Sequence, residues 1–292
     1  MTNDKNLFEV TEYKLGNYII GIATNIGPRI LKFALKDHPE NNLFGILPDF
    51  GVATKEGFWR IYGGHRLWAA PEATPRSYSL DNSPVKVEAK KEYLKIYGNT
   101  ETQNSICKEI VIRKNNSNSI EVTHRIKNTG RWTIELACWA LTVMKKGGFA
   151  VVPIARGGKG ILPDRKVVLW PYTDISDRRL VMQKDFIFLK QDEKALGPCK
   201  IGVSANPCWT AYWNHGMLFI KQFVDEQADY PDYGSSVEAY TNPEMLELET
   251  LGPLKKLQPG QSAEHKEVWS IKKVSSLSPC QLDMKKKIGT WL

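Results

Sequence analysis

Ile120-Glu121-Val122-Thr123-His124-Arg125-Ile126-Lys127 alternates between two kinds of residue. The even positions hold isoleucine, valine, histidine and isoleucine, and the odd positions are polar. Because successive side chains of a β-strand point to opposite faces, this period of two predicts a strand with one apolar and one polar face. His124 falls on the apolar face, so its imidazole needs either a buried hydrogen-bonding partner or a place in the wall of a cleft.

Short stretches of the same kind recur from end to end of the chain, separated by Gly, Pro, Asn and Asp. No segment of helical length carries a convincing apolar stripe at a spacing of 3.6 residues. The sequence therefore predicts an all-β protein of many antiparallel strands in stacked sheets. The expected strands are 18–23, 29–35, 85–89, 93–97, 106–113, 119–127, 133–143, 167–170, 186–189, 200–204, 210–213, 217–223, 236–240, 245–249 and 267–272.

The chain has 292 residues, of which 42% are hydrophobic, and this is enough to bury a large core. No long linker divides it, so we expect one sandwich domain over residues 1–275 and a C-terminal tail over residues 276–292, packed on the domain or trailing from it. The formal net charge is +8, but the 40 Lys and Arg residues are spread among 32 acidic residues. This distribution argues against nucleic acid as a partner.

Several partner and cofactor classes have no support in the sequence. Residues 1–6 are polar, and no run of about 18 apolar residues predicts a targeting segment or a membrane span. The five cysteines are scattered without a CxxC spacing, which favours reduced thiols in a cytoplasmic protein. No His or acidic residues have the spacing typical of a metal site, and we expect no cofactor. The chain is expected to be a monomer or a homodimer.

Residues 63–72 read Gly-Gly-His-Arg-Leu-Trp-Ala-Ala-Pro-Glu and gather the chemical parts of a sugar site. The two glycines permit backbone conformations closed to other residues, and an imidazole, a guanidinium, an indole and a carboxylate follow. Sugar rings stack their C–H faces on indoles, and their hydroxyls pair with charged groups. A surface turn with a solvated His65 is the alternative interpretation. The expected ligand-contacting residues are Trp59, Arg60, Arg66, Trp68 and Glu72.

Two further groups of polar residues lie on predicted strands. Glu247 and Glu249 share a face opposite a run of leucines. That face either points to solvent or forms the concave side of a curved sheet. On a concave side, one of the two glutamates is placed to act as a general base. His265 and Glu267 share a face with Trp269 on the closing strand, and a solvated edge is the place expected for His265 and Glu267.

Taken in order, these features resemble the galactose mutarotase-like (aldose 1-epimerase-like) superfamily over most of the chain. The resembling segments are Asn-Ile-Gly-Pro-Arg-Ile (25–30), Gly-Gly-His-Arg-Leu-Trp (63–68), Lys-Asn-Thr-Gly (127–130), Leu-Glu-Thr-Leu-Gly-Pro (248–253) and Leu-Gln-Pro-Gly-Gln (257–261). The resemblance implies a single-domain antiparallel β-supersandwich and a catalytic glutamate at the position of Glu249. One departure concerns the strand after residue 130, where typical members carry a second histidine and this chain offers Trp139.

The resemblance implies a carbohydrate-binding protein, and in particular a mutarotase, an isomerase that interconverts sugar anomers by ring opening. One group removes the proton of the anomeric hydroxyl while another protonates the ring oxygen. In this hypothesis Glu249 is the base, His65 or else His124 is the acid, and Glu72 orients His65 or Arg66. The alternative is a non-catalytic carbohydrate-binding protein that has lost the acid–base pair. The ligand in either case is a small sugar, neutral or anionic.

Overall fold

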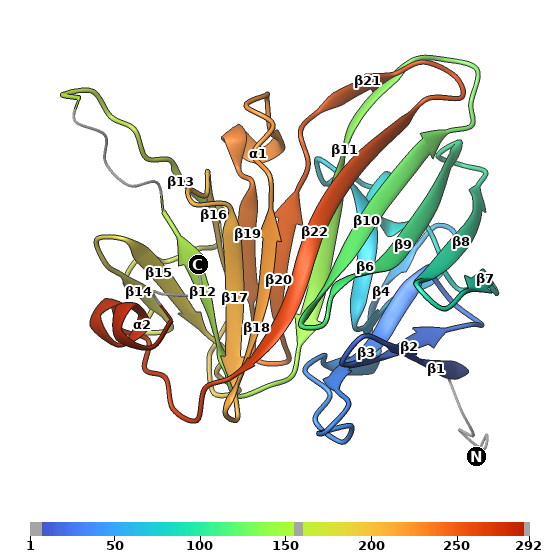
Figure 1. Ribbon diagram of the computed structural model, residues 1–292. Coiled ribbons are helices and arrows are strands. Elements are labelled where there is room, and N and C mark those ends of the chain that lie inside the picture. The colour runs from blue at the N-terminus through green and yellow to red at the C-terminus, as the bar shows by residue number, and fades with distance from the viewer. Residues whose placement is uncertain (1–7, 155–159, 289–292) are drawn as a thin grey trace.

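The chain folds into a sandwich of two ten-stranded antiparallel sheets in the computed structural model, which describes residues 8–154 and 160–288 (Figure 1). Sheet I consists, in spatial order, of β1 (Val10–Leu15), β2 (Tyr18–Ala23), β3 (Arg29–Leu35), β6 (His65–Ala70), β11 (Ile134–Met144), β20 (Leu246–Leu251), β19 (Val237–Thr241), β16 (Cys199–Val203) and β13 (Val167–Leu169), with β21 (Lys255–Leu257) paired to β11. Sheet II consists of β14 (Leu180–Met182), β15 (Phe186–Lys190), β12 (Phe149–Pro153), β17 (Trp209–Asn214), β18 (Met217–Phe223), β22 (Ser262–Lys273), β10 (Ser119–Asn128), β9 (Ile106–Asn116), β8 (Tyr93–Glu101) and β7 (Lys86–Ala89).

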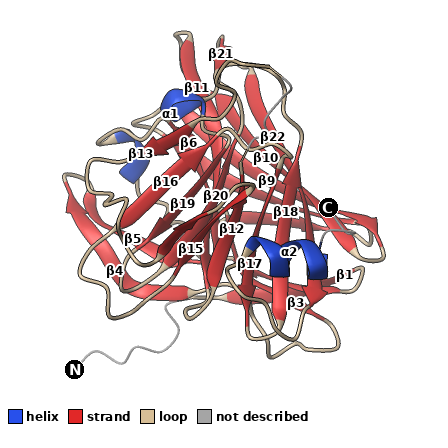
Figure 2. Cartoon of the chain, turned by 90° about the vertical axis from the view of Figure 1, so that its left-hand side faces the viewer, coloured by secondary structure: helices blue, strands red, loops and turns tan. Residues whose placement is uncertain are grey.

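The remaining elements are short. A separate hairpin is formed by β4 (Ile46–Thr54) and β5 (Gly57–Gly63), and a 3₁₀ turn, η1, covers Arg76–Tyr78. The helices are α1 (Pro231–Gly234) and α2 (Gln281–Ile288). Figure 2 shows how little helix accompanies the strands. Within the described ranges, no helix is long and apolar enough to cross a membrane.

The all-β prediction is confirmed, and every expected strand range overlaps a strand of the structure. Three of the ranges coincide with β2, β3 and β18 from the first residue to the last. The pattern missed β1, β4, β5, β6, β12, β14 and β21. The omission of β6 matters most, because this strand carries His65, Arg66, Leu67 and Trp68 of the Gly-Gly-His-Arg-Leu-Trp segment into the middle of sheet I.

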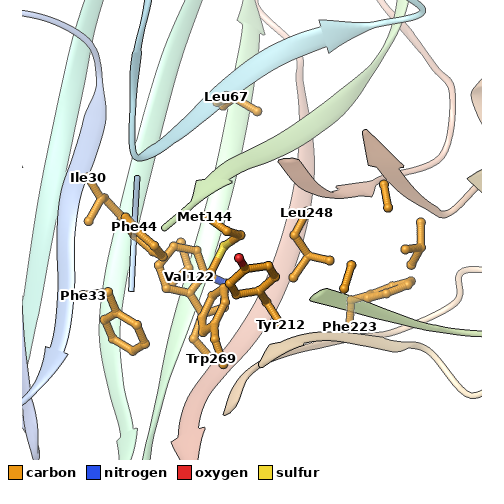
Figure 3. Packing of buried hydrophobic residues seen from close by; sticks show 14 of the residues in the cluster. Ile30, Phe33, Phe44, Leu67, Val122, Met144, Tyr212, Phe223, Leu248 and Trp269 are labelled. Carbon is orange, nitrogen blue, oxygen red and sulfur yellow. The ribbon is translucent and has the colours of Figure 1, made fainter. Parts of the chain in front are cut away.

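The main core lies between the two sheets. Ile120, Val122 and Ile126 of β10 are fully buried, as their alternation predicts, and they pack in one cluster with residues of sheet I. Figure 3 shows the aromatic part of this core, where the rings of Phe33 and Trp269 meet edge to face with their centres 5.4 Å apart. These contacts fix which side chains of sheet I point inward, and therefore which ones point to its other face.

The described part of the C-terminal tail forms α2, a helix that the sequence pattern did not indicate. Met284 and Ile288 are buried in a second apolar cluster with Val274 and Leu277, against strands at the β14–β15 end of sheet II. A side-chain oxygen of Gln183 accepts a hydrogen bond from the first backbone N–H of the helix at 2.6 Å. The helix therefore packs on the sandwich instead of extending from it.

Candidate functional site: a cleft on the outer face of sheet I

The backbone before β6 requires glycine at two consecutive positions. Gly63 and Gly64 have φ values of +91° and +66°, a region that side chains disfavour. A Cβ atom would stand 2.2 Å from the carbonyl oxygen of Gly45 at the first position and 2.3 Å from that of Ile30 at the second. The chain therefore passes directly from this turn into β6, which pairs with β3 and β11 on its two sides.

The pleat of β6 then divides its side chains between two environments. His65 and Leu67 point toward sheet II, and Leu67 belongs to the core between the sheets. Arg66 and Trp68 point to the opposite, outer face, where the β4–β5 hairpin lies beside them. The adjacent residues His65 and Arg66 therefore lie on opposite faces of sheet I, His65 between the sheets and Arg66 on the outer face.

The outer face of sheet I holds a cleft of about 370 Å³. Aromatic rings supply much of its surface, and charged side chains from four segments of the chain project among them. The aromatic lining residues are Phe50, Trp59, Trp68, Tyr78, Trp139, Trp170, Tyr172 and Tyr240. The charged lining residues are Arg66, Glu72, Lys200, Glu247 and Glu249.

Arg66 is held in the wall of the cleft by an ion pair and by stacking. Its Nη1 donates to Oε1 of Glu247 at 2.6 Å, and both side chains are buried. The guanidinium also lies over the indole of Trp68, 4.5 Å from the ring centre, and 5.8 Å from that of Trp59. These contacts leave the Nε atom of Arg66 buried without a hydrogen-bond partner.

Lys200 forms a second cluster with two carboxyl groups. Its Nζ lies 2.7 Å from Oε2 of Glu238 and 3.1 Å from Oε2 of Glu249. The two glutamates stand directly opposite each other on β19 and β20, and Nε1 of Trp139 donates to Oε2 of Glu249 at 2.8 Å. The ammonium also lies 4.6 Å and 4.5 Å from the ring centres of Trp139 and Trp170.

Burial and pairing shift the pKa values of this cluster. Burial raises the pKa of Glu249 above its ordinary value, although the charge of Lys200 opposes the shift. Burial raises the pKa of Glu238 further. Burial alone would lower the pKa of Lys200, but the two carboxylates raise it above the usual range of a lysine. Lys200 therefore stays an ammonium, while the two glutamates share a strong tendency to hold a proton.

Glu72 occupies an exposed part of the lining. The sequence hypothesis that Glu72 orients His65 or Arg66 is wrong, because its carboxylate pairs with a tyrosine instead. Its Oε1 accepts a hydrogen bond of 2.5 Å from the hydroxyl of Tyr78. Burial raises the pKa values of Tyr78 and Tyr172, and the negative charge of Glu72 contributes to both shifts. The carboxylate therefore lies within electrostatic range of two tyrosines of the lining.

The structure brings His65 and His124 together but separates them from Glu249. The two imidazoles are fully buried between the sheets, with their Nε2 atoms 2.7 Å apart, and neither lines the cleft. Glu249 projects from the other face of sheet I. The sequence hypothesis placed one of these histidines and Glu249 in a single cleft as acid and base. That hypothesis is wrong, because the pleat of β6 directs His65 to the opposite face of sheet I from Glu249.

The contacts around the two histidines determine which ring nitrogen of each carries the proton. Nδ1 of His124 lies 3.1 Å from the carbonyl oxygen of His265, which only accepts, so this nitrogen carries a proton. In a neutral ring Nε2 of His124 is then an acceptor, and His65 donates to it. The Nδ1 atom of His65 accepts in turn from the hydroxyl of Thr142 at 2.9 Å. Burial lowers the pKa values of both imidazoles, which keeps them neutral.

The same interior network continues into sheet II. Lys221 forms an ion pair of 3.1 Å with Glu267, both fully buried, and Nε1 of Trp269 donates to that carboxylate at 2.7 Å. Burial acts to raise the pKa of Glu267, but the charge of Lys221, the two nearby histidines and the hydrogen bond from Thr250 together outweigh it and bring the pKa to about 2. The expectation of a solvated edge for His265 and Glu267 is wrong, because β22 is an interior strand between β18 and β10.

Within the described residues, one group of three potential metal ligands occurs, formed by His65, His124 and Glu267 within 4.8 Å of one another. Two nitrogens bound to a tetrahedral zinc ion at its usual bond length stand about 3.3 Å apart. The observed separation of 2.7 Å between the Nε2 atoms is shorter and suits a shared proton. The hydrogen-bond network accounts for this cluster without an ion.

Among the other predicted site residues, Trp59 and Trp68 line the cleft with their ring centres 5.3 Å apart. Arg60 does not line it, since it points away from its neighbour Trp59 and stacks on Phe58 at 5.0 Å. Sequence reasoning missed Lys200, because a single lysine on a predicted strand is ordinarily solvated. Only the pairing of β16 with β19 reveals that this side chain faces two glutamates.

Comparisons with known proteins find similar folds but no similar sequence. No protein-family model matches the chain, and no curated protein matches it in sequence. A galactose mutarotase-like protein from Lactobacillus casei is 9% identical, with a TM-score of 0.55 over 90% of this chain and 100% of that one. A galactose mutarotase related enzyme from Lactobacillus acidophilus is also 9% identical, with a TM-score of 0.56 over 92% and 99%.

A third solved structure has a different name. A TPR-domain containing protein from Parabacteroides distasonis is 10% identical and has a TM-score of 0.62 over 93% of this chain and 49% of that one. Together with the sheet order and the cleft, these likenesses show that the chain has the galactose mutarotase-like fold.

Proposed function

We propose that this chain, which has the galactose mutarotase-like fold, binds a sugar in the cleft on the outer face of sheet I. The observation that carries the proposal is the combination of indole surfaces with two fixed ion pairs, Arg66 with Glu247 and Lys200 with Glu249. Indole faces suit the C–H faces of a sugar ring, and fixed charges suit its hydroxyls. The cleft volume of about 370 Å³ lies within the range usual for small-molecule sites.

The test is a titration of the protein with neutral hexoses, followed by calorimetry and by saturation-transfer NMR. Trp170→Ala removes a half-buried ring of the lining and is expected to weaken binding about tenfold. Trp132→Ala is the matched control, because Trp132 is 81% exposed and does not line the cleft. The absence of binding for every sugar, or equal losses in the two variants, would refute the proposal.

A second candidate function is mutarotation, and the position of Glu249 favours it. The carboxyl lines the cleft, and burial raises its pKa toward the range suited to a general base. No histidine lines the cleft within the described residues. The proton donor in this mechanism is then a tyrosine hydroxyl of the lining, from Tyr172 or Tyr240, and both have raised pKa values and are weak acids.

This candidate is tested by NMR exchange between the anomers of freshly dissolved hexoses. We expect Glu249→Gln to abolish any acceleration, and Glu264→Gln, a change at a half-buried residue of β22 that does not line the cleft, to leave it intact. Binding without acceleration would identify a carbohydrate-binding protein that lacks the isomerase activity. Acceleration that survives Glu249→Gln would show that Glu249 is not the base.

A further inference from the structure

We infer that the cleft selects sugars that carry a protonated amine over phosphorylated or carboxylated sugars, with Glu72 as the counter-charge for the amine. This inference rests on the proposed sugar binding and names the class of sugar. It departs from the sequence-based expectation, which left open a neutral or an anionic sugar.

The two cations of the cleft are already neutralised by the protein. Arg66 is paired with Glu247 at 2.6 Å, and Lys200 lies between Glu238 and Glu249 at 2.7 Å and 3.1 Å. A phosphate or carboxylate of a ligand would have to compete with these buried partners and would meet their like charges. Among the described lining residues, the carboxyl groups of Glu72, Glu247 and Glu249 outnumber the cations Arg66 and Lys200, although the chain as a whole has a net charge of +8.

The cleft places cations in one recurring way, against an aromatic face and beside a carboxylate. Arg66 lies 4.5 Å from the ring centre of Trp68 and pairs with Glu247. Lys200 lies 4.6 Å from that of Trp139 and pairs with Glu249. Both distances fall within the roughly 6 Å over which a cation is attracted by an aromatic ring.

Glu72 offers a third carboxylate beside aromatic rings, and among the described residues it lacks a paired cation. Within residues 8–154 and 160–288, no lysine or arginine forms an ion pair with Glu72. Its carboxylate accepts from the hydroxyl of Tyr78 and acts electrostatically on Tyr172 as well. An ammonium group of a bound sugar would complete the third pairing of a cation with a carboxylate and aromatic rings.

The experiment compares glucosamine and galactosamine with glucose and galactose, and adds glucose 6-phosphate and glucuronate. Affinities are measured by calorimetry at a pH at which the amine is protonated. We expect each amino sugar to bind about five- to tenfold more tightly than its neutral counterpart, and both anionic sugars to bind more weakly than glucose. The preference is expected to shrink at high salt, because Glu72 is exposed.

Three variants test the part assigned to Glu72. Glu72→Gln removes the charge and is expected to bring the ratio of amino-sugar to neutral-sugar affinity close to one. Tyr78→Phe removes the hydrogen bond but keeps the carboxylate, so the preference is expected to persist. Glu193→Gln is the matched charge change outside the cleft, on a side chain 64% exposed, and is expected to have no effect on the ratio.

Equal affinity for amino and neutral sugars, tighter binding of glucose 6-phosphate than of glucose, or an unchanged ratio in Glu72→Gln would overturn this inference while leaving sugar binding intact. The absence of binding for all six compounds would instead refute the proposed function on which it rests.

Discussion

Replacement of Lys221 by methionine tests the buried network between the sheets. Lys221 and Glu267 are both fully buried, and their charges lie 3.1 Å apart. Removal of one partner of a buried ion pair costs about 3–5 kcal/mol, because the remaining charge is left without compensation. Here the carboxylate keeps donors from Thr250 and from Trp269. We therefore expect Lys221→Met to lower the free energy of unfolding by about 3 kcal/mol, at the lower end of that range.

The pH dependence of the variant gives a second readout. In the native protein the lowered pKa of Glu267 contributes stability above the ordinary glutamate pKa, and this contribution is lost as the pH falls toward about 2. Without Lys221, the largest contribution that opposes burial is lost, and we expect the pKa of Glu267 to rise above its unfolded value. The free energy of unfolding of Lys221→Met should then fall further as the pH increases above the unfolded glutamate pKa.

Urea unfolding followed by tryptophan fluorescence measures these changes. The double variant Lys221→Met/Glu267→Gln is expected to recover at least about 2 kcal/mol relative to the sum of the single changes. Lys255→Met is the control, since its partner Glu226 and Lys255 itself are more than 40% exposed, and it should cost about 0–1 kcal/mol. A loss below about 1 kcal/mol in Lys221→Met, or additive single changes, would refute the reasoning.

Three other predictions concern the interior histidines and the turn before β6. Burial lowers the pKa values of the interior histidines, that of His265 to about 3. Below about pH 6.5 the unfolded chain therefore binds more protons than the folded one, and the urea concentration at the midpoint of unfolding should decrease when the pH is lowered from 7 to 5. Equal midpoints at the two pH values would contradict this prediction. ¹⁵N NMR should find the proton of His65 on Nε2 and none on Nδ1, and the reverse tautomer would break the assigned chain of donors. Gly64→Ala should destabilise the protein by more than about 3 kcal/mol, because backbone strain adds to a clash with the Ile30 carbonyl oxygen. The control is Gly147→Ala, where φ is +94° and a Cβ atom would meet no atom within 4 Å, so that strain alone should cost about 1–2 kcal/mol. Similar losses in the two variants would show that the clash at Gly64 relaxes.

The sequence was informative where polar and apolar residues alternate along a strand. The alternation in β10 placed His124 on the inner face, and the alternation in β20 placed Glu247 and Glu249 together. It failed for β6, where all six residues are buried and polar and apolar side chains occur on both faces. A strand that carries polar residues on both of its faces lacks the period-two contrast on which the prediction depends.

One signal for the site was nevertheless present in that segment. His65 and Arg66 are consecutive, so if they lie on a strand they cannot share a face. The sequence hypothesis treated residues 63–72 as an approach to a site, and it assigned both side chains to one cleft. The contribution of Lys200 and Glu238 was beyond sequence reasoning, because their meeting depends on the pairing of β16, β19 and β20, which are far apart in the chain.

The two polar clusters on opposite faces of sheet I together specify its register. In β6 and β20, consecutive residues belong to different clusters: His65 and Thr250 to the interior network, Arg66 and Glu249 to the cleft. A slip of one residue in either strand would exchange the faces, leaving a guanidinium or a carboxylate without its partner between the sheets. Apolar packing alone tolerates such an exchange better than paired charges do. The buried network, although costly to desolvate, therefore holds the strands in the one alignment that assembles the cleft.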